Sequence, residues 1–170
     1  VKQIHRLEVA GCELVRVAVP DMEAAEKLGE IKRKISIPLV ADIHFDYRLA
    51  LEALKQGVDK LRLNPGNIRD KEKVRLIAQS AKVKGVPIRI GVNAGSLAKD
   101  ILKKCGQVTS AALVESALEE VNFLESLGLF DLVISLKAFD VPMTIQAYRL
   151  ISEKVDYPLH IGITESGLPL

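Results

Sequence analysis

The sequence has few aromatic residues and almost no cysteine. Of its 170 residues 4% are aromatic, none is tryptophan, and Cys12 and Cys105 are the two cysteines. These cysteines establish neither a disulfide framework nor a cysteine-based metal site. No apolar run approaches the ~18 residues needed to span a bilayer, and no charged-then-apolar leader opens the chain. We therefore expect a cytoplasmic protein that does not associate with a membrane.

The charges of the sequence nearly cancel. There are 24 Lys and Arg against 22 Asp and Glu, which gives a net charge of +2. This balance argues against a nucleic-acid-binding protein that acts through bulk positive charge. The length and the 48% hydrophobic content suit one domain with a substantial core. We expect a single domain over residues 1–170.

One pattern recurs along the chain after an initial helix near residues 1–8. A short run rich in Val, Ile and Leu is followed by a polar turn and then by a segment with helical periodicity. In the longest such segment, Leu113, Ala117, Val121 and Leu124 share one helix face. The continuous apolarity of the short runs is typical of parallel strands that are covered on both faces. The predicted strands are residues 13–19, 38–43, 58–63, 87–92, 130–136 and 157–163.

This repeat predicts an α/β fold with a parallel sheet, either an open doubly wound sheet or a barrel. No G-x-G-x-x-G segment follows the first strand, as a dinucleotide-binding open sheet would usually show. Six units over 170 residues average about 28 residues each, close to the repeat of a TIM (β/α)8 barrel. We therefore predict an incomplete TIM barrel with about six of its eight βα units, part of a larger barrel.

Polar residues recur at the carboxyl ends of these strands with a spacing of two, which places them on one face. Charged side chains inside apolar strands are costly to bury unless they are paired or bind a ligand. Their convergence would form a cationic, hydrogen-bonding cup at the mouth of the barrel. The residues are Arg16, Asp42, His44, Arg62, Asn64, Arg89, Gly91, Asn93, Ser135, Lys137, His160, Gly162 and Thr164, with Glu165 directly after them.

The cup suits a small polyanion, because Arg supplies forked donors for phosphate oxygens and Lys137 a compact charge. Glu165 is the carboxylate best placed for proton transfer, with Asp42 and Asp140 as further candidates. A Schiff base at Lys137 is the alternative chemistry. A metal ion is not expected, since Asp42 and His44 have too few companion ligands. Ser96 is a candidate N-cap for the helix that follows it.

Five long motifs resemble, in order, the barrel domain of the 4-hydroxy-3-methylbut-2-enyl diphosphate synthases, over essentially the whole chain. The motifs are residues 41–48 (ADIHFDYR), 62–67 (RLNPGN), 89–97 (RIGVNAGSL), 135–138 (SLKA) and 160–165 (HIGITE). The resemblance implies reductive ring opening of 2-C-methyl-D-erythritol 2,4-cyclodiphosphate in isoprenoid biosynthesis. It also implies a [4Fe-4S] cluster, flavodoxin or ferredoxin as electron donor, and a homodimer in which one subunit's cluster domain closes over the other's barrel.

Carried over by motif, Arg16, Arg62, Arg89 and Lys137 correspond to diphosphate ligands of this family. His44 and Asn93 correspond to supporting contacts, and Glu165 to the residue that faces the reacting carbon and the cluster. Asp42, Asn64, Ser135 and Thr164 complete the substrate-binding set that we predict.

The chain departs from the family at several points. The Cys-Pro-x-Cys segment that binds the cluster is absent, and Cys12 is expected to be a buried structural thiol. Phe139 stands where the family has a small serine, and the end of the sequence leaves the family pattern. The first and last barrel strands, with a further arginine ligand, are also expected to be missing. On its own the chain is therefore expected to be inactive. The alternative is a non-catalytic barrel that binds a phosphorylated ligand.

Overall fold

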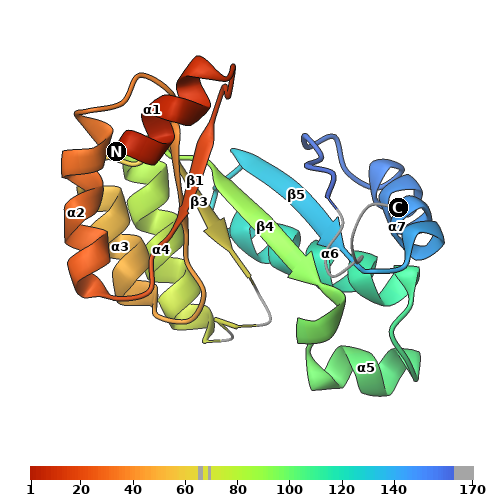
Figure 1. Ribbon diagram of the computed structural model, residues 1–170. Coiled ribbons are helices and arrows are strands. Elements are labelled where there is room, and N and C mark those ends of the chain that lie inside the picture. The colour runs from red at the N-terminus through yellow and green to blue at the C-terminus, as the bar shows by residue number, and fades with distance from the viewer. Residues whose placement is uncertain (65–66, 69, 163–170) are drawn as a thin grey trace.

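The computed structural model describes residues 1–64, 67–68 and 70–162 (Figure 1). The strands are β1 (Val15–Ala18), β2 (Leu39–Asp42), β3 (Lys60–Leu63), β4 (Ile88–Asn93) and β5 (Leu132–Lys137). The helices are α1 (Lys2–Val9), α2 (Met22–Lys32), α3 (Tyr47–Lys55), α4 (Lys71–Lys84), the 3₁₀ turn η1 (Ala94–Ser96), α5 (Lys99–Cys105), α6 (Ser110–Ser126) and α7 (Val141–Ser152).

The five strands form one parallel sheet in the order β1-β2-β3-β4-β5. Each strand therefore pairs with the next strand along the chain. In a doubly wound sheet the strand order reverses at a switch point, whereas a barrel keeps the sequential order. The observed order confirms the predicted α/β fold and the incomplete TIM-type barrel.

The sixth predicted strand, residues 157–163, differs from the others. Within its described part it pairs with β5 through a single parallel bridge between Ile134 and Leu159. The pairing stops there because the hydroxyl group of Tyr148 contacts the backbone of both segments at the next position. Sequence periodicity indicated the strand but not this interruption.

The helices cover the outer face of the sheet. Helix α3 packs between α2 and α4, and α6 packs against β4, β5, α5 and α7 (Figure 1). Most of these helices begin where an Asp or Thr side chain accepts a backbone N–H group of the first turn, which satisfies an otherwise unpaired donor. These N-cap residues are Asp21, Asp46, Asp70, Thr109 and Asp140.

The hydrophobic core lies between the sheet and these helices. Alternate strand residues on this side are almost fully buried: Leu39, Ala41, Leu61, Ile88, Ile90, Leu132 and Ile134. The intervening residues face the barrel interior, and several of them are charged or polar. The outer face of the sheet therefore packs into the hydrophobic core, whereas the inner face carries charged and polar side chains.

Two neighbouring residues of α4 test this arrangement of layers. Ile77 is fully buried, whereas Leu76 is 47% exposed. We expect Ile77→Ala to lower the free energy of unfolding by about 2–5 kcal/mol, the usual cost of such a truncation in a packed core.

The matched control, Leu76→Ala, should change it by about 0.5 kcal/mol or less. Urea denaturation of both variants measures the two values. Equal losses would contradict the assignment of the buried face of α4.

Candidate functional site

The register of the sheet brings the predicted polar residues together inside the barrel. Asp42 of β2 lies beside Arg62 of β3, which lies beside Arg89 of β4. Further along the strands, Gly91 lies beside Ser135 and Asn93 beside Lys137. Neighbouring parallel strands are about 4.8 Å apart, so one patch of the inner face carries three positive side chains and one carboxylate.

The carboxylate of Asp42 is the centre of this patch and is buried. Its Oδ1 accepts a hydrogen bond of 3.1 Å from Nη1 of Arg62, and its Oδ2 lies 3.5 Å from Nη1 of Arg16 on β1. Nε2 of His44 lies 3.7 Å from the same Oδ2. Asp42 therefore contacts three basic side chains from three segments of the chain.

Arg62 is 4% exposed and lies over Gly91 of the next strand. A Cβ atom at position 91 would lie 2.7 Å from Nε of Arg62, which is closer than real Cβ contacts allow. Only glycine at position 91 leaves room for the guanidinium in this position. The spacing of residues along the strand predicts that Gly91 lies on the inner face, but it does not indicate this steric role.

Arg89 is 5% exposed, and its Nε and Nη2 atoms have no hydrogen-bond partner among the described residues. Burial, with the positive charges of Arg16 and Arg62, lowers the pKa of Arg89 to about 10. The guanidinium therefore stays charged near neutral pH. A buried charged group whose donors lack partners is costly, and these two N–H groups could donate hydrogen bonds to an anion.

Lys137 and His160 complete the basic lining. Burial, then Arg16, Arg89 and Arg62, lower the pKa of Lys137. Burial, followed by the positive charge of Arg89, lowers the pKa of His160. Nδ1 of His160 lies 3.5 Å from Oγ of Ser135. The strand-end pattern places His160 in the cup, but His160 was not among the predicted substrate-binding residues.

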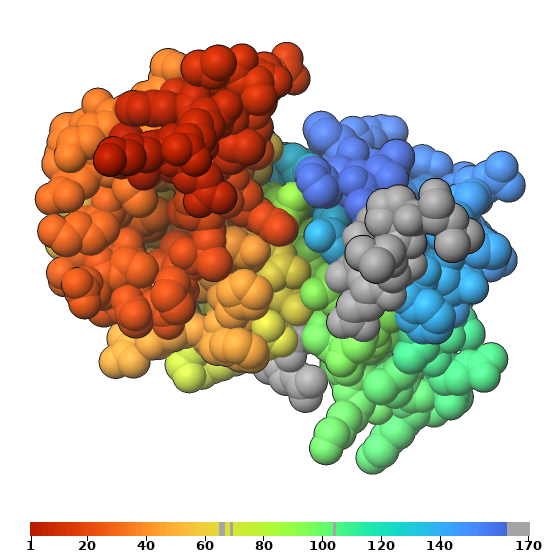
Figure 2. Space-filling view, viewed as in Figure 1, coloured from red at the N-terminus to blue at the C-terminus, as the bar shows by residue number. Residues whose placement is uncertain are grey.

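Four of these basic side chains, Arg16, Arg89, Lys137 and His160, line a hollow of about 280 Å³. Its lining comes from both ends of the chain and from the strands between them, namely Leu14, Arg16, Val40, Lys60, Arg89, Val133, Lys137 and His160. In Figure 2 the red and orange surface of the first elements and the blue surface around α7 lie on opposite sides of the yellow and green middle of the chain. Lys60 is a further lining cation that the strand-end pattern did not indicate.

A second cluster of polar residues connects the ends of β3 and β4. Nδ2 of Asn64 donates to Oγ of Ser96 at 3.0 Å, and Oγ of Ser96 lies 3.3 Å from the carbonyl oxygen of Asn93. The N-cap of α5 is Ala98, without a side-chain hydrogen bond. The hypothesis that Ser96 caps the following helix is therefore wrong, because its hydroxyl is used to join the two loops and the turn η1 precedes the helix.

Beside this group lies a hollow of about 600 Å³ with mixed lining. Asn93 and Ser96 lie on its polar side, whereas Val108, Phe139 and Met143 are apolar. Phe139 is 66% exposed, so it stands at the rim and does not fill the cationic cup. The residue that departs from the family pattern therefore borders this second hollow.

Two of the predicted site residues, Thr164 and Glu165, lie outside the described residues. The prediction that Cys12 is a buried thiol is wrong. Cys12 is half-buried, because it lies in the surface segment after α1, and its thiol contacts the carbonyl oxygen of Leu14 at 3.0 Å. Among the described residues no three His, Cys, Asp or Glu side chains are grouped for a metal ion.

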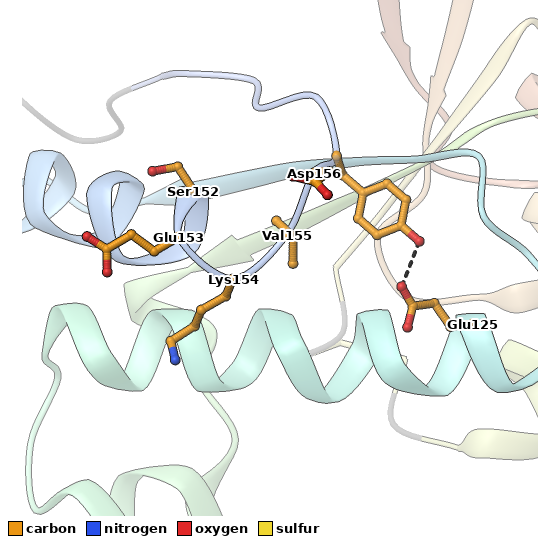
Figure 3. A pocket seen from close by; sticks show the side chains of 7 residues that line it. Glu125, Ser152, Glu153, Lys154, Val155 and Asp156 are labelled. Carbon is orange, nitrogen blue, oxygen red and sulfur yellow. Dashed lines mark hydrogen bonds between the residues drawn. The ribbon is translucent and has the colours of Figure 1, made fainter.

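A third hollow, of about 460 Å³, lies away from the cup (Figure 3). Its lining includes Glu125 of α6, Ser152 at the end of α7 and residues 153–157 after it. Tyr157 donates to Oε1 of Glu125 at 2.7 Å, the dashed line in Figure 3. Burial, followed by Glu125, raises the pKa of Tyr157 to about 12. The predicted site residues do not line this hollow.

Comparison with known proteins identifies the family. The model of the GcpE TIM-barrel domain matches residues 1–170. The chain belongs to the GcpE family. Over 167 residues it is 60% identical to the 4-hydroxy-3-methylbut-2-en-1-yl diphosphate synthase (flavodoxin) of Caldanaerobacter subterraneus subsp. tengcongensis. It is 61% identical over 167 residues to the synthase of the same name from Thermodesulfovibrio yellowstonii.

The chain spans about half the length of these relatives. Each alignment covers 98% of this chain but 47% and 48% of the two relatives. Among solved structures, Yersinia pestis dihydropteroate synthase matches 95% of this chain and 64% of its own, with a TM-score of 0.63 at 12% identity. That similarity supports the fold alone. No helix in the described part of this GcpE-family chain is both long and apolar enough to cross a bilayer.

The contact between Gly91 and Arg62 gives a direct test of the site. We expect Gly91→Ala to displace the Arg62 guanidinium from Asp42 and to lower the free energy of unfolding by about 1–3 kcal/mol, the cost of overpacking. Urea denaturation measures the change.

Gly95 provides the control, because a Cβ atom there would meet no atom within 4 Å. Gly95→Ala should leave stability within about 0.5 kcal/mol of the parent. A Gly91→Ala protein as stable as Gly95→Ala would show that the close approach is not required.

Proposed function

We propose that this chain is the substrate-binding barrel of a 4-hydroxy-3-methylbut-2-enyl diphosphate synthase, an oxidoreductase of isoprenoid biosynthesis. Its substrate would be 2-C-methyl-D-erythritol 2,4-cyclodiphosphate. The observation that carries the proposal is the cup around Asp42, in which Arg89 presents two buried donor atoms that have no partner in the described part of the chain. The names of relatives about 60% identical to the chain support the same function.

The chemistry of the cup fits a diphosphate. Arg16, Arg62, Arg89 and Lys137 supply four cations against the single carboxylate of Asp42. Guanidinium groups bind phosphate oxygens through paired N–H donors, and a lysine acts as a point charge. A bound diphosphate would offset the mutual repulsion of these cations. Asp42 would keep Arg16 and Arg62 oriented before the substrate arrives.

The uncharged polar groups have supporting roles in this proposal. Asn93 and Ser135 lie beside Lys137 and Gly91 in the register of β4 and β5, where they would hydrogen-bond the substrate. His44 and Asn64, at the ends of β2 and β3, would form the rim of the site. Thr164 and Glu165 follow the described segment, and we propose that Glu165 transfers a proton at the reacting carbon.

Ring opening in this enzyme class is reductive, and a [4Fe-4S] cluster supplies the electrons. Such clusters are commonly held by four cysteine thiolates. The chain contains two cysteines, one after α1 and one at the end of α5, and no cluster-binding group is present among the described residues. These residues do not fit the cluster, which would be held outside this chain. Flavodoxin or ferredoxin as donor, and a homodimer, belong to the same proposal.

The Schiff-base alternative rests on the lowered pKa of Lys137. The surrounding arginines that contribute to this shift would also disfavour an iminium ion, because an iminium is itself cationic. An anion site accounts for all four cations, whereas a Schiff base accounts for Lys137 alone. The cup therefore favours diphosphate binding over carbonyl chemistry.

Substitution of the buried arginines tests the proposal. We expect Arg62→Ala and Arg89→Ala each to weaken binding of the cyclodiphosphate by about 1.5–3 kcal/mol, the range for hydrogen bonds to charged groups. Isothermal titration calorimetry at fixed salt concentration measures the affinity.

The control is Arg149→Ala, since Arg149 is an exposed residue of α7 outside the cup. Its affinity should equal that of the parent. Unchanged binding in both cup variants would refute the proposed site, and binding without turnover in the cluster-containing protein would favour a non-catalytic phosphate-binding barrel.

A further inference from the structure

Tyr148 of α7 joins the two strand segments that flank the gap in the sheet. Its ring is buried, at 8% exposure. The hydroxyl oxygen accepts the backbone N–H of Leu136 on β5 at 3.0 Å, and the hydroxyl group donates to the carbonyl oxygen of His160. Buried tyrosines usually place the hydroxyl on a partner, but here both partners are strand backbone groups.

The hydrogen bonds before this point follow the regular parallel pattern. The N–H of Ile134 donates to the carbonyl of Pro158 at 3.0 Å, and the N–H of His160 donates to the carbonyl of Ile134 at 2.8 Å. In a parallel ladder the next bond would run from the N–H of Leu136 to the carbonyl of His160. The hydroxyl of Tyr148 stands between these two groups and bonds to each.

This inserted hydroxyl lies beside the cationic cup. Leu136 precedes Lys137, and the segment 160–162 runs along the Lys137 side chain. A Cβ atom at Gly162 would lie 3.6 Å from Cε and 3.9 Å from Nζ of Lys137. The same segment holds the His160 ring 3.5 Å from Ser135. The separation of the two segments therefore determines what surrounds the Lys137 ammonium group.

We propose that Tyr148 is a positioning residue of the cup. Its hydroxyl replaces one hydrogen bond of the barrel ladder and so sets the spacing between Lys137 on β5 and the segment 160–162. The role of Tyr148 as a spacer stands on the backbone geometry. Its importance for anion binding rests on the proposed function.

Tyr148→Phe removes only the hydroxyl. The phenyl ring keeps the two segments apart, so the N–H of Leu136 and the carbonyl of His160 cannot bond directly and each loses its partner. An unpaired buried backbone group is costly. Segment 160–162 then moves away from β5, and water reaches Lys137 and His160.

Tyr157→Phe is a matched control. Tyr157 also donates a hydrogen bond, to Glu125 at 2.7 Å, in the hollow of Figure 3. Its loss removes a tyrosine hydroxyl from the same part of the chain without touching the cup. Any general cost of deleting a bonded tyrosine hydroxyl appears in both variants.

The first measurement is the titration of the Lys137 ammonium group by NMR in the ligand-free protein. The groups that face it are Arg16 of β1, Asp42 of β2, Arg62 of β3, Arg89 of β4 and His160. Neither variant replaces any of these residues, and we expect only His160, on the displaced segment of Tyr148→Phe, to change its distance from Lys137. We expect the pKa of Lys137 to move toward its ordinary value in Tyr148→Phe and to stay unchanged in Tyr157→Phe. The second measurement is pyrophosphate affinity, which we expect to fall about tenfold in Tyr148→Phe only, the loss of roughly one hydrogen bond.

Equal losses of thermal stability in the two variants, with the Lys137 titration and pyrophosphate affinity unchanged, would overturn the inference and leave Tyr148 a purely structural residue. If the Lys137 titration changes in Tyr148→Phe but the parent protein does not bind pyrophosphate, the spacer role is supported and the proposed function is refuted. The two hypotheses can therefore fail separately.

Discussion

The contact of the buried Asp42 carboxylate with Arg62 and Arg16 is the interaction on which the cup depends. Among the described residues of the cup, Asp42 is the acidic side chain beside the cations Arg16, Arg62, Arg89 and Lys137, and it bonds to the most buried of them, Arg62, at 3.1 Å. A buried ion pair contributes little net stability, but loss of one partner leaves an uncompensated charge. Asp42 thus holds the arginines in place at a cost in desolvation, and the remaining positive charge is available to an anion.

The sheet register makes this arrangement possible. The strands present apolar residues to the helices and polar residues to the interior. The outer face therefore stabilises the fold, whereas the clustered positive charges of the inner face cost free energy. Two uncharged features help to position the groups on the inner face. Gly91 leaves space for Arg62, and Tyr148 separates β5 from the segment that carries His160. The arrangement of the cup therefore depends on small backbone and steric features as well as on the charged side chains.

Much of this could be predicted from the sequence. Apolar runs at regular intervals indicated the parallel strands, and the spacing of two at strand ends placed Arg62, Arg89 and Lys137 on one face. The sequence could not indicate contacts that require the assembled sheet. The close approach at Gly91 depends on the register of β3 and β4, and the use of Ser96 to join two loops depends on where Asn64 lies. Tyr148 is an ordinary core position by helical periodicity, and its hydroxyl acquires a role only when α7 packs on β5.

The most direct test of the account is the free energy of unfolding of Asp42→Asn, with and without pyrophosphate. The variant keeps an amide oxygen but removes the negative charge that compensates the buried Arg62, so we expect a loss of about 3–5 kcal/mol, while Asp21→Asn, a change between equivalent N-cap residues, should have little effect. We also expect pyrophosphate to stabilise Asp42→Asn less than the parent, because Arg16 and Arg62 then lack the carboxylate that orients them. An Asp42→Asn protein as stable as the parent, or one that gains as much from pyrophosphate as the parent does, would contradict the account.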